Sequence, residues 1–192
     1  MPAKPREIPF REELTFLKAM IARPKGVGAV APSSPALARA IARQIDPDTA
    51  GKVLELGPGT GVVTEALVER GVNATRIVAV EYDPELARMV AARVPKAQVI
   101  VGDAFNLDAT LGTQAEPFIS AVSGVPLLNF TMRQRHAYVE DVLRRLRTGG
   151  AMVQFSYGLT PPVPACRDFS VERVAVIWLN LPPARVWLYR RR

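Results

Sequence analysis

The feature that most constrains this chain is the stretch VLELGPGTG at residues 53–61, which leads into a helical pattern over 62–70. A short apolar run meets an acidic residue, Glu55, and three glycines spaced two residues apart follow it. Glycine lets the backbone adopt left-handed angles and approach a ligand closely, and the helix N-terminus behind the loop attracts negative charge. The pattern therefore predicts a strand, a loop and a helix that together hold a nucleoside.

Two further acidic residues follow the next two apolar runs. Glu81 ends a predicted strand over 76–80, about twenty residues beyond the glycines, where a carboxylate reaches ribose hydroxyls in doubly wound folds. Asp103 follows a predicted strand over 97–101, where the adenine amino group is contacted in this fold class. Glu55, Glu81 and Asp103 thus occupy matching places at three successive predicted strands. This agreement favours a nucleoside site over three unrelated, solvated acidic residues.

The spacing of the glycines separates two kinds of nucleoside fold. The dinucleotide fingerprint places its third glycine one residue later than Gly61 stands here. The observed pattern, E-x-G-x-G-T-G, instead resembles class I methyltransferases that use S-adenosylmethionine. The resemblance implies an α/β, Rossmann-like seven-stranded sheet, with S-adenosylhomocysteine as the cofactor product. The cofactor contacts that it implies are Glu55, Gly57, Gly59, Thr60, Gly61, Glu81, Tyr82, Asp103, Ala104 and Ser123.

The remaining apolar runs complete one doubly wound domain. We expect the last two strands to pair antiparallel through Leu181-Pro182-Pro183. The other predicted elements are a helix over 35–44 capped by Ser33 or Ser34, a strand over 118–122, a helix over 133–146 closed by Gly149 and Gly150, and strands over 151–157, 171–179 and 184–189.

The N-terminal segment has two interpretations, which stay open. Residues 10–23 lie between two prolines and place apolar side chains at helical spacing with basic ones beside them. Such a helix packs on the core or lies in a bilayer interface, and it can move between the two. We divide the chain into residues 1–34, an amphipathic helix with a cofactor-covering loop, and residues 35–192, the methyltransferase domain. The membrane contacts expected on the second interpretation are Phe10, Leu14, Leu17, Lys18 and Ile21.

Composition and charge limit the partners. The net charge of +7 resides at the two ends: residues 1–50 carry eight Lys or Arg against five acids, and residues 151–192 carry six against two. This asymmetry favours an anionic partner, either a membrane or a nucleic acid. One cysteine excludes an intrachain disulfide framework, and no apolar run approaches the roughly 20 residues of a membrane span. We expect a cytoplasmic monomer at the inner face of the cytoplasmic membrane. A solitary histidine, His136, predicts no metal site.

A narrower resemblance covers nearly the whole chain. The amphipathic helix, the segment PKGVGAVAPSS at 24–34, the glycine loop, and the later pieces EYDP, GDAF, SGVPLL and QFSYG are similar to bacterial phospholipid N-methyltransferases. Those enzymes methylate phosphatidylethanolamine toward phosphatidylcholine, so the resemblance implies a phospholipid substrate at an anionic membrane surface. An ornithine lipid or another aminolipid is the alternative acceptor.

Candidate headgroup residues follow from their place after the strands. Ser123 and the carbonyls of Gly124 and Val125 are expected to accept hydrogen bonds from the amine, and with Tyr157 they form the predicted catalytic set. An aromatic face attracts a quaternary ammonium by about 0.5 to 2 kcal/mol. Tyr157, together with Phe130 or Tyr82, is the candidate for this contact. The predicted substrate contacts are Lys25, Ser33, Ser34, Phe130, Tyr157 and Arg167.

Two rival functions remain. RNA adenine dimethyltransferases share the glycine loop but carry N-[IL]-P-[YF] after the fourth strand, whereas this chain has SGVPL at 123–127 and lacks both the amide and the stacking ring. We therefore expect no nucleic-acid partner. A non-catalytic protein that merely keeps the nucleoside fold is the second rival, and the intact acids and glycines argue against it.

Overall fold

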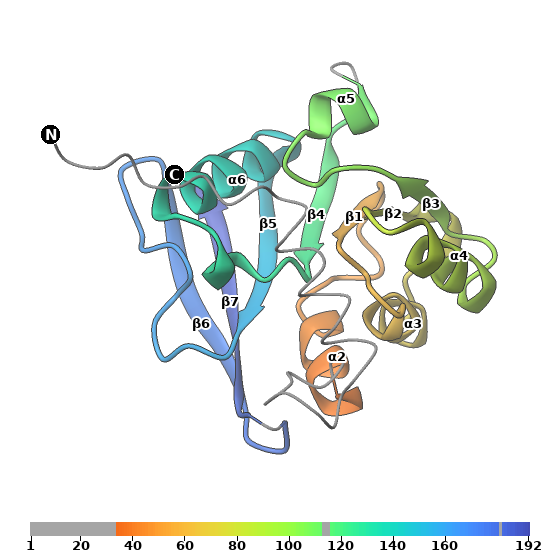
Figure 1. The fold of residues 1–192 in the computed structure, drawn as a ribbon, viewed down its shortest axis with the longest axis horizontal. Coiled ribbons are helices and arrows are strands. Elements are labelled where there is room, and N and C mark those ends of the chain that lie inside the picture. The colour runs from red at the N-terminus through yellow and green to blue at the C-terminus, as the bar shows by residue number, and fades with distance from the viewer. Residues whose placement is uncertain (1–33, 113–115, 181) are drawn as a thin grey trace, which may run out of the picture. The chain divides into compact units, whose positions relative to one another are not determined.

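The computed structural model describes residues 34–112, 116–180 and 182–192. These residues form a seven-stranded sheet with helices on both faces (Figure 1). Among them, no helix combines the length and apolar composition needed to cross a bilayer. The predictions made for Phe10, Leu14, Leu17, Lys18, Ile21, Lys25 and Ser33 lie outside the described residues.

The sheet has the strand order β3-β2-β1-β4-β5-β7-β6. The first five strands in this order are parallel to one another, whereas β7 runs antiparallel to both β5 and β6. This arrangement confirms the predicted α/β class, the seven strands and the antiparallel last pair. The strands are β1 Val53–Leu56, β2 Ile77–Glu81, β3 Gln98–Val101, β4 Phe118–Ser123, β5 Leu146–Ser156, β6 Phe169–Ile177 and β7 Ala184–Arg191.

The helices begin where side chains satisfy their first backbone N–H groups. The Ser34 hydroxyl accepts a hydrogen bond from the Leu37 N–H at 3.2 Å, as predicted, and Asp83 and Thr131 cap two later helices in the same way. The helices are α2 Pro35–Ala42, α3 Val62–Glu69, α4 Pro84–Arg93, α5 Leu107–Leu111 and α6 Met132–Arg144, with short 3₁₀ turns η1 Ala74–Arg76 and η2 Leu127–Asn129.

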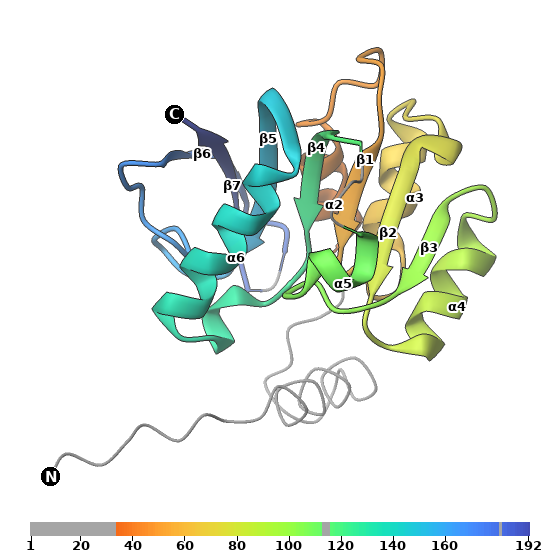
Figure 2. The ribbon, with the colours of Figure 1, turned by 90° about the horizontal axis from the view of Figure 1, so that it is seen from above.

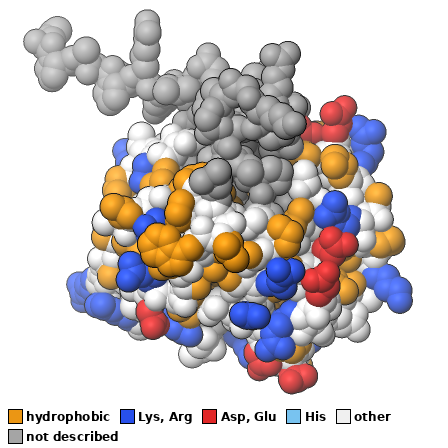
Figure 3. Space-filling view, turned by 90° about the horizontal axis from the view of Figure 1, so that it is seen from below, with side chains coloured by type: hydrophobic (Ala, Val, Ile, Leu, Met, Phe, Trp, Pro, Cys, Tyr) orange, Lys and Arg blue, Asp and Glu red, His pale blue; other side chains and the backbone are white. Residues whose placement is uncertain are grey.

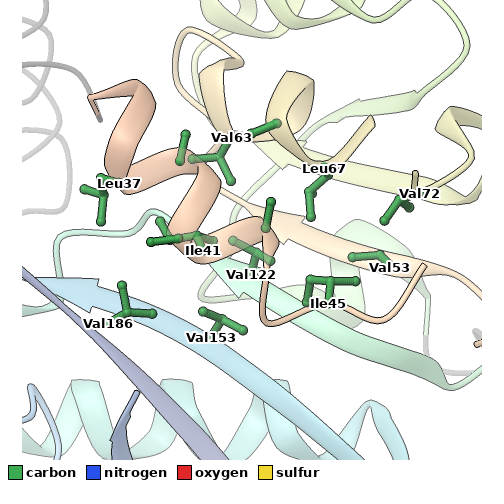
Figure 4. Packing of buried hydrophobic residues seen from close by; sticks show 14 of the residues in the cluster. Leu37, Ile41, Ile45, Val53, Val63, Leu67, Val72, Val122, Val153 and Val186 are labelled. Atoms are coloured by element: carbon green, nitrogen blue, oxygen red, sulfur yellow. The ribbon is translucent and has the colours of Figure 1, made fainter. Parts of the chain in front are cut away.

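The core divides between the two faces of the sheet because successive strand residues point to opposite sides. Val122 and Val153 pack with Leu37 and Ile41 of α2 in one apolar cluster (Figure 4). Helix α6 covers the other face, opposite α2 (Figure 2). Each fully buried aliphatic side chain stabilises such a core by about 1.5 to 3 kcal/mol.

The prediction that Gly149 and Gly150 close the second long helix is wrong. Helix α6 ends at Arg144 and β5 begins only two residues later, so both glycines lie inside the strand. The pairing of β4 with β5 is irregular there, and Gly149 has a φ of 80°. Glycine serves this irregularity because it adopts left-handed angles at little cost.

Candidate active site

The carboxyl ends of β1, β2 and β4 meet at one edge of the sheet. Leu56 pairs with both Val80 and Ser123, and the Gly57 N–H donates a hydrogen bond to the Val80 carbonyl at 2.9 Å. The loop turns through three glycines with φ of 66°, 58° and 81° before α3 begins. A Cβ placed on the middle glycine, Gly59, would meet no atom of the described residues within 4 Å. Within this part of the chain, the loop therefore borders open space where a ligand can approach the backbone.

Glu81, at the end of β2, is tied to this loop. One carboxylate oxygen accepts a hydrogen bond from the Gly59 N–H and the other from the Asp83 N–H, each at 3.0 Å. Burial raises the pKa of Glu81, and these backbone hydrogen bonds oppose the rise. The Tyr82 N–H also contributes a backbone hydrogen bond that lowers this pKa. A carboxylate has about four lone-pair sites, so the side chain can still accept a hydrogen bond from a ribose hydroxyl.

Glu55, in the middle of β1, is a buried carboxyl group with unmet bonding capacity. The residue is 1% exposed, and neither side-chain oxygen has a hydrogen-bond partner in the described part of the chain. Burial raises its pKa to about 7. Thr64 lies near enough to lower that pKa in part, although no hydrogen bond of ordinary geometry joins the two side chains. An unpartnered buried carboxyl fits a site that a polar or cationic ligand completes.

The segment after β3 is held by a compact set of hydrogen bonds. An Asp103 carboxylate oxygen accepts from the Phe105 N–H at 2.8 Å, and Thr110 bonds both the N–H and the carbonyl of Asp103 at 3.1 Å. Asp103 and Ala104 are half-buried at the predicted adenine position. The Phe105 ring packs on Phe130, with ring centroids 4.4 Å apart.

The end of β4 passes directly beside the glycine loop. The Gly124 N–H donates to the Leu56 carbonyl at 2.8 Å, and a Cβ on Gly124 would lie 2.4 Å from the Gly57 carbonyl oxygen. Only glycine fits this approach. Ser123 is fully buried, and its hydroxyl lies 2.7 Å from that of Tyr138 on α6. Burial raises the pKa of Tyr138, so that phenol stays protonated.

The expectation that the Val125 carbonyl accepts the substrate amine needs correction. That oxygen already accepts hydrogen bonds from the Leu127 N–H at 2.8 Å and from the Gln154 Nε2 at 3.1 Å. A carbonyl has two lone pairs, and both are engaged. The Gly124 carbonyl accepts no hydrogen bond within the described residues and is the remaining candidate.

Tyr157 and Ser34 come together at the carboxyl edge of β5. The phenol of Tyr157 is half-buried beside Asn180, and burial raises its pKa. The Asn180 side-chain oxygen accepts from the Ser34 N–H at 3.3 Å, so this amide links the start of α2 to the β6–β7 turn. Of the other aromatic candidates, Phe130 is buried in the ring cluster, whereas Tyr82 is exposed beside Glu81.

Arg167 lies away from the site, and its assignment as a substrate contact is wrong. Phe169, two residues later, pairs with Arg191, beside the Arg190–Ala151 pair. Ala151 in turn pairs with Ser120, near the amino end of β4. The site lies at the carboxyl end of β5. The stretch of strand from Ala151 to Ser156 separates that end from the level of Phe169 by about 17 Å. The loop 157–168 thus crosses from one edge of the sheet to the other.

Two residues that sequence reasoning missed hold the site in shape. Arg135 on α6 donates from Nε to the Phe130 carbonyl at 2.7 Å and from its two terminal nitrogens to the carbonyls of Leu128 and Pro162. Gln154 fixes the Val125 carbonyl, and its own side-chain oxygen is buried without a partner in the described chain. The neighbouring sequence does not mark Arg135 or Gln154 as a site residue, because the groups that each one bonds are distant in the chain.

A sheet of this order, with a glycine loop and acids at its carboxyl edge, defines a class I S-adenosylmethionine-dependent methyltransferase. The chain belongs to the methyltransferase-domain family, whose model matches residues 53–150. S-adenosylmethionine is therefore its cofactor, and the open glycine loop, Glu81 and the unpartnered Glu55 fit that molecule. Among the described residues no cluster of three metal-ligating side chains occurs.

Three similar proteins illustrate how far the likeness extends. The ornithine lipid N-methyltransferase of Singulisphaera acidiphila is 30% identical over 188 residues, covering 94% of this chain and 97% of that protein. The dimethyladenosine transferase of Schizosaccharomyces pombe is 36% identical over 81 residues, covering 39% of this chain and 25% of that protein. A Bacillus cereus O-methyltransferase solved with S-adenosylhomocysteine matches with a TM-score of 0.63 at 17% identity, covering 96% and 92% of the two chains.

Proposed function

We propose that this protein transfers methyl groups from S-adenosylmethionine to the amine of an aminolipid, with an ornithine lipid as the first acceptor to test. The observation that carries the proposal is how much of the chain resembles the ornithine lipid N-methyltransferase. The likeness to the ornithine lipid N-methyltransferase runs through nearly the whole of both chains, including the parts outside the cofactor loop. The likeness to the dimethyladenosine transferase covers only a quarter of that protein.

The arrangement after β4 suits an amine acceptor. The Gly124 carbonyl lies beside the glycine loop and offers an acceptor for an N–H, while Ser123 is locked to Tyr138 beneath it. The Tyr157 phenol, whose pKa burial raises, stays neutral and presents an aromatic ring to an ammonium group. S-adenosylmethionine supplies the electrophilic methyl group, so the protein's task is to orient an unprotonated amine and exclude water.

Phosphatidylethanolamine, the acceptor favoured by sequence resemblance, is the second aminolipid to test. It presents the same chemistry, a primary amine near an anionic group at a membrane surface. RNA is less well suited because Leu127, which is fully buried, occupies the place after Pro126 where RNA adenine dimethyltransferases carry an aromatic ring. We propose an anionic membrane surface as the partner on which the enzyme meets its lipid.

The test is methyl transfer from labelled S-adenosylmethionine to vesicles that carry ornithine lipid, phosphatidylethanolamine or neither, with structured RNA in parallel. We expect label in the aminolipid, and the Glu81→Gln variant serves as a control that should weaken cofactor binding. Label in RNA alone, or no label in either aminolipid despite cofactor binding, would refute the proposal.

A further inference from the structure

The turn between β6 and β7 exposes two large apolar side chains. Trp178 is 73% exposed and Leu179 is 89% exposed. The next residue, Asn180, is 3% exposed and donates from its side-chain nitrogen to the Pro182 carbonyl at 2.8 Å. The described part of the turn therefore buries the Asn180 amide and leaves Trp178 and Leu179 exposed. Exposing such side chains to water has a cost, which an apolar partner removes.

This turn lies at the edge of the sheet that carries the proposed active site. Asn180 bonds the Ser34 N–H and lies beside Tyr157, and Ile177 pairs with Ala184 at the base of the turn. In Figure 1 the turn forms the lower end of the hairpin. Figure 3 views the molecule from below and shows hydrophobic side chains gathered there, with Lys and Arg side chains among them.

The exposed charged residues near the turn are mainly basic. No acidic residue occurs after Glu172, and none occurs from Ser34 to Ile45, the segment that contains α2. Arg39 of α2 and Arg43, which follows it, are exposed, and Arg173 is exposed on β6 beside the exposed Glu172. Arg185 on β7 is buried, and one of its terminal nitrogens lies 3.5 Å from the Pro183 carbonyl. An apolar tip with cationic flanks matches an interface in which acyl chains lie beneath anionic headgroups.

We propose that the Trp178–Leu179 turn inserts into the interfacial region of a bilayer that contains anionic lipid. Tryptophan favours this region because one end of its ring system is apolar and the other donates a hydrogen bond. Insertion brings the carboxyl edge of the sheet to the membrane surface. That this position delivers the lipid substrate to the site rests on the proposed aminolipid function, whereas insertion itself does not.

The chain contains two tryptophans, which makes the test local. Trp187 is buried and donates from its indole nitrogen to the Ser156 hydroxyl at 3.0 Å, so quenching by brominated acyl chains reports mainly on Trp178. The full chain is titrated with vesicles of phosphatidylcholine and phosphatidylglycerol, with and without bromine, so no aminolipid is present. We expect quenching in the brominated vesicles and at least tenfold weaker vesicle binding by a W178S/L179S variant.

The matched control removes two apolar side chains from the opposite end of the sheet. Val68 and Met89 lie on α3 and α4 and are 38% and 48% exposed, and their double serine variant should bind vesicles as the wild type does. Unquenched Trp178 in bound protein would overturn the proposal. Protection of Trp178 from iodide without vesicles would also overturn it, because another part of the chain or a second copy would then cover the turn. Insertion without aminolipid methylation would instead refute only the proposed function.

Discussion

The buried carboxyl group of Glu55 should make stability fall as pH rises. Its pKa stands at about 7 in the folded protein against 4.5 for an exposed glutamate. One pKa unit corresponds to 1.36 kcal/mol, so the difference amounts to about 3 kcal/mol. The folded state holds this proton more tightly than the unfolded state. The contribution of Glu55 to the free energy of unfolding is therefore complete below pH 4.5 and is lost as pH rises through 7.

The perturbation that isolates this effect is Glu55→Gln, which keeps the shape of the neutral side chain and removes its titration. We expect the free energy of unfolding of the wild type to fall between pH 5 and pH 8 by about 3 kcal/mol more than that of the variant. Denaturant titrations of both proteins at several pH values supply the measurement. Glu69→Gln, which removes an exposed carboxylate at the end of α3, should leave the pH profile of the wild type unchanged.

The same group should respond to the cofactor. S-adenosylmethionine is a cation, and its approach favours the ionised form of a nearby carboxyl group. Binding near pH 7 should therefore release protons, which calorimetry detects as a dependence of the binding enthalpy on the buffer. The Glu55→Gln variant should release fewer protons on binding. Identical pH profiles of stability in the wild type and Glu55→Gln would refute the reasoning, since they would mean that the carboxyl group is not held neutral by burial.

Two further predictions concern the end of β4. Gly124→Ala should destabilise the fold by about 1 to 3 kcal/mol and abolish cofactor binding, because its Cβ would lie 2.4 Å from the Gly57 carbonyl oxygen. Thermal melts of each variant supply the measurement. Gly158→Ala should be tolerated in them, because its Cβ would meet no atom of the described residues closer than 3.5 Å. A double-mutant cycle of Ser123→Ala and Tyr138→Phe should give a coupling energy of about 1 kcal/mol for their 2.7 Å hydrogen bond. Additive effects on unfolding would mean that this hydrogen bond contributes nothing.

The sequence predicted the parts of this protein that local patterns encode. The glycine loop, the strand-end acids and the apolar periodicity placed the sheet and Glu81 correctly, because each pattern involves neighbouring residues. The Ser34 cap was foreseen for the same reason. These features need only backbone geometry and the alternation of apolar side chains.

What the sequence did not reveal depends on distant partners. Gly149 and Gly150 looked like a helix end, but an irregularity in the pairing with β4 places them within β5. Arg167 looked close to the site in sequence, but the crossing loop carries it to the other edge of the sheet. The clamp that Arg135 forms requires carbonyls from two separate segments. Only the assembled fold brings such groups together.

The proposed activity of the site at the carboxyl edge of the sheet is methylation of the amine of an aminolipid. The most direct measurement is mass spectrometry of lipids recovered after incubating the purified protein with S-adenosylmethionine and mixed vesicles of ornithine lipid and phosphatidylethanolamine. We predict a product heavier by one or more methyl groups, with fragments that place them on the amine of ornithine lipid. Methyl groups on an oxygen, or unchanged lipids beside methylated RNA, would contradict the account.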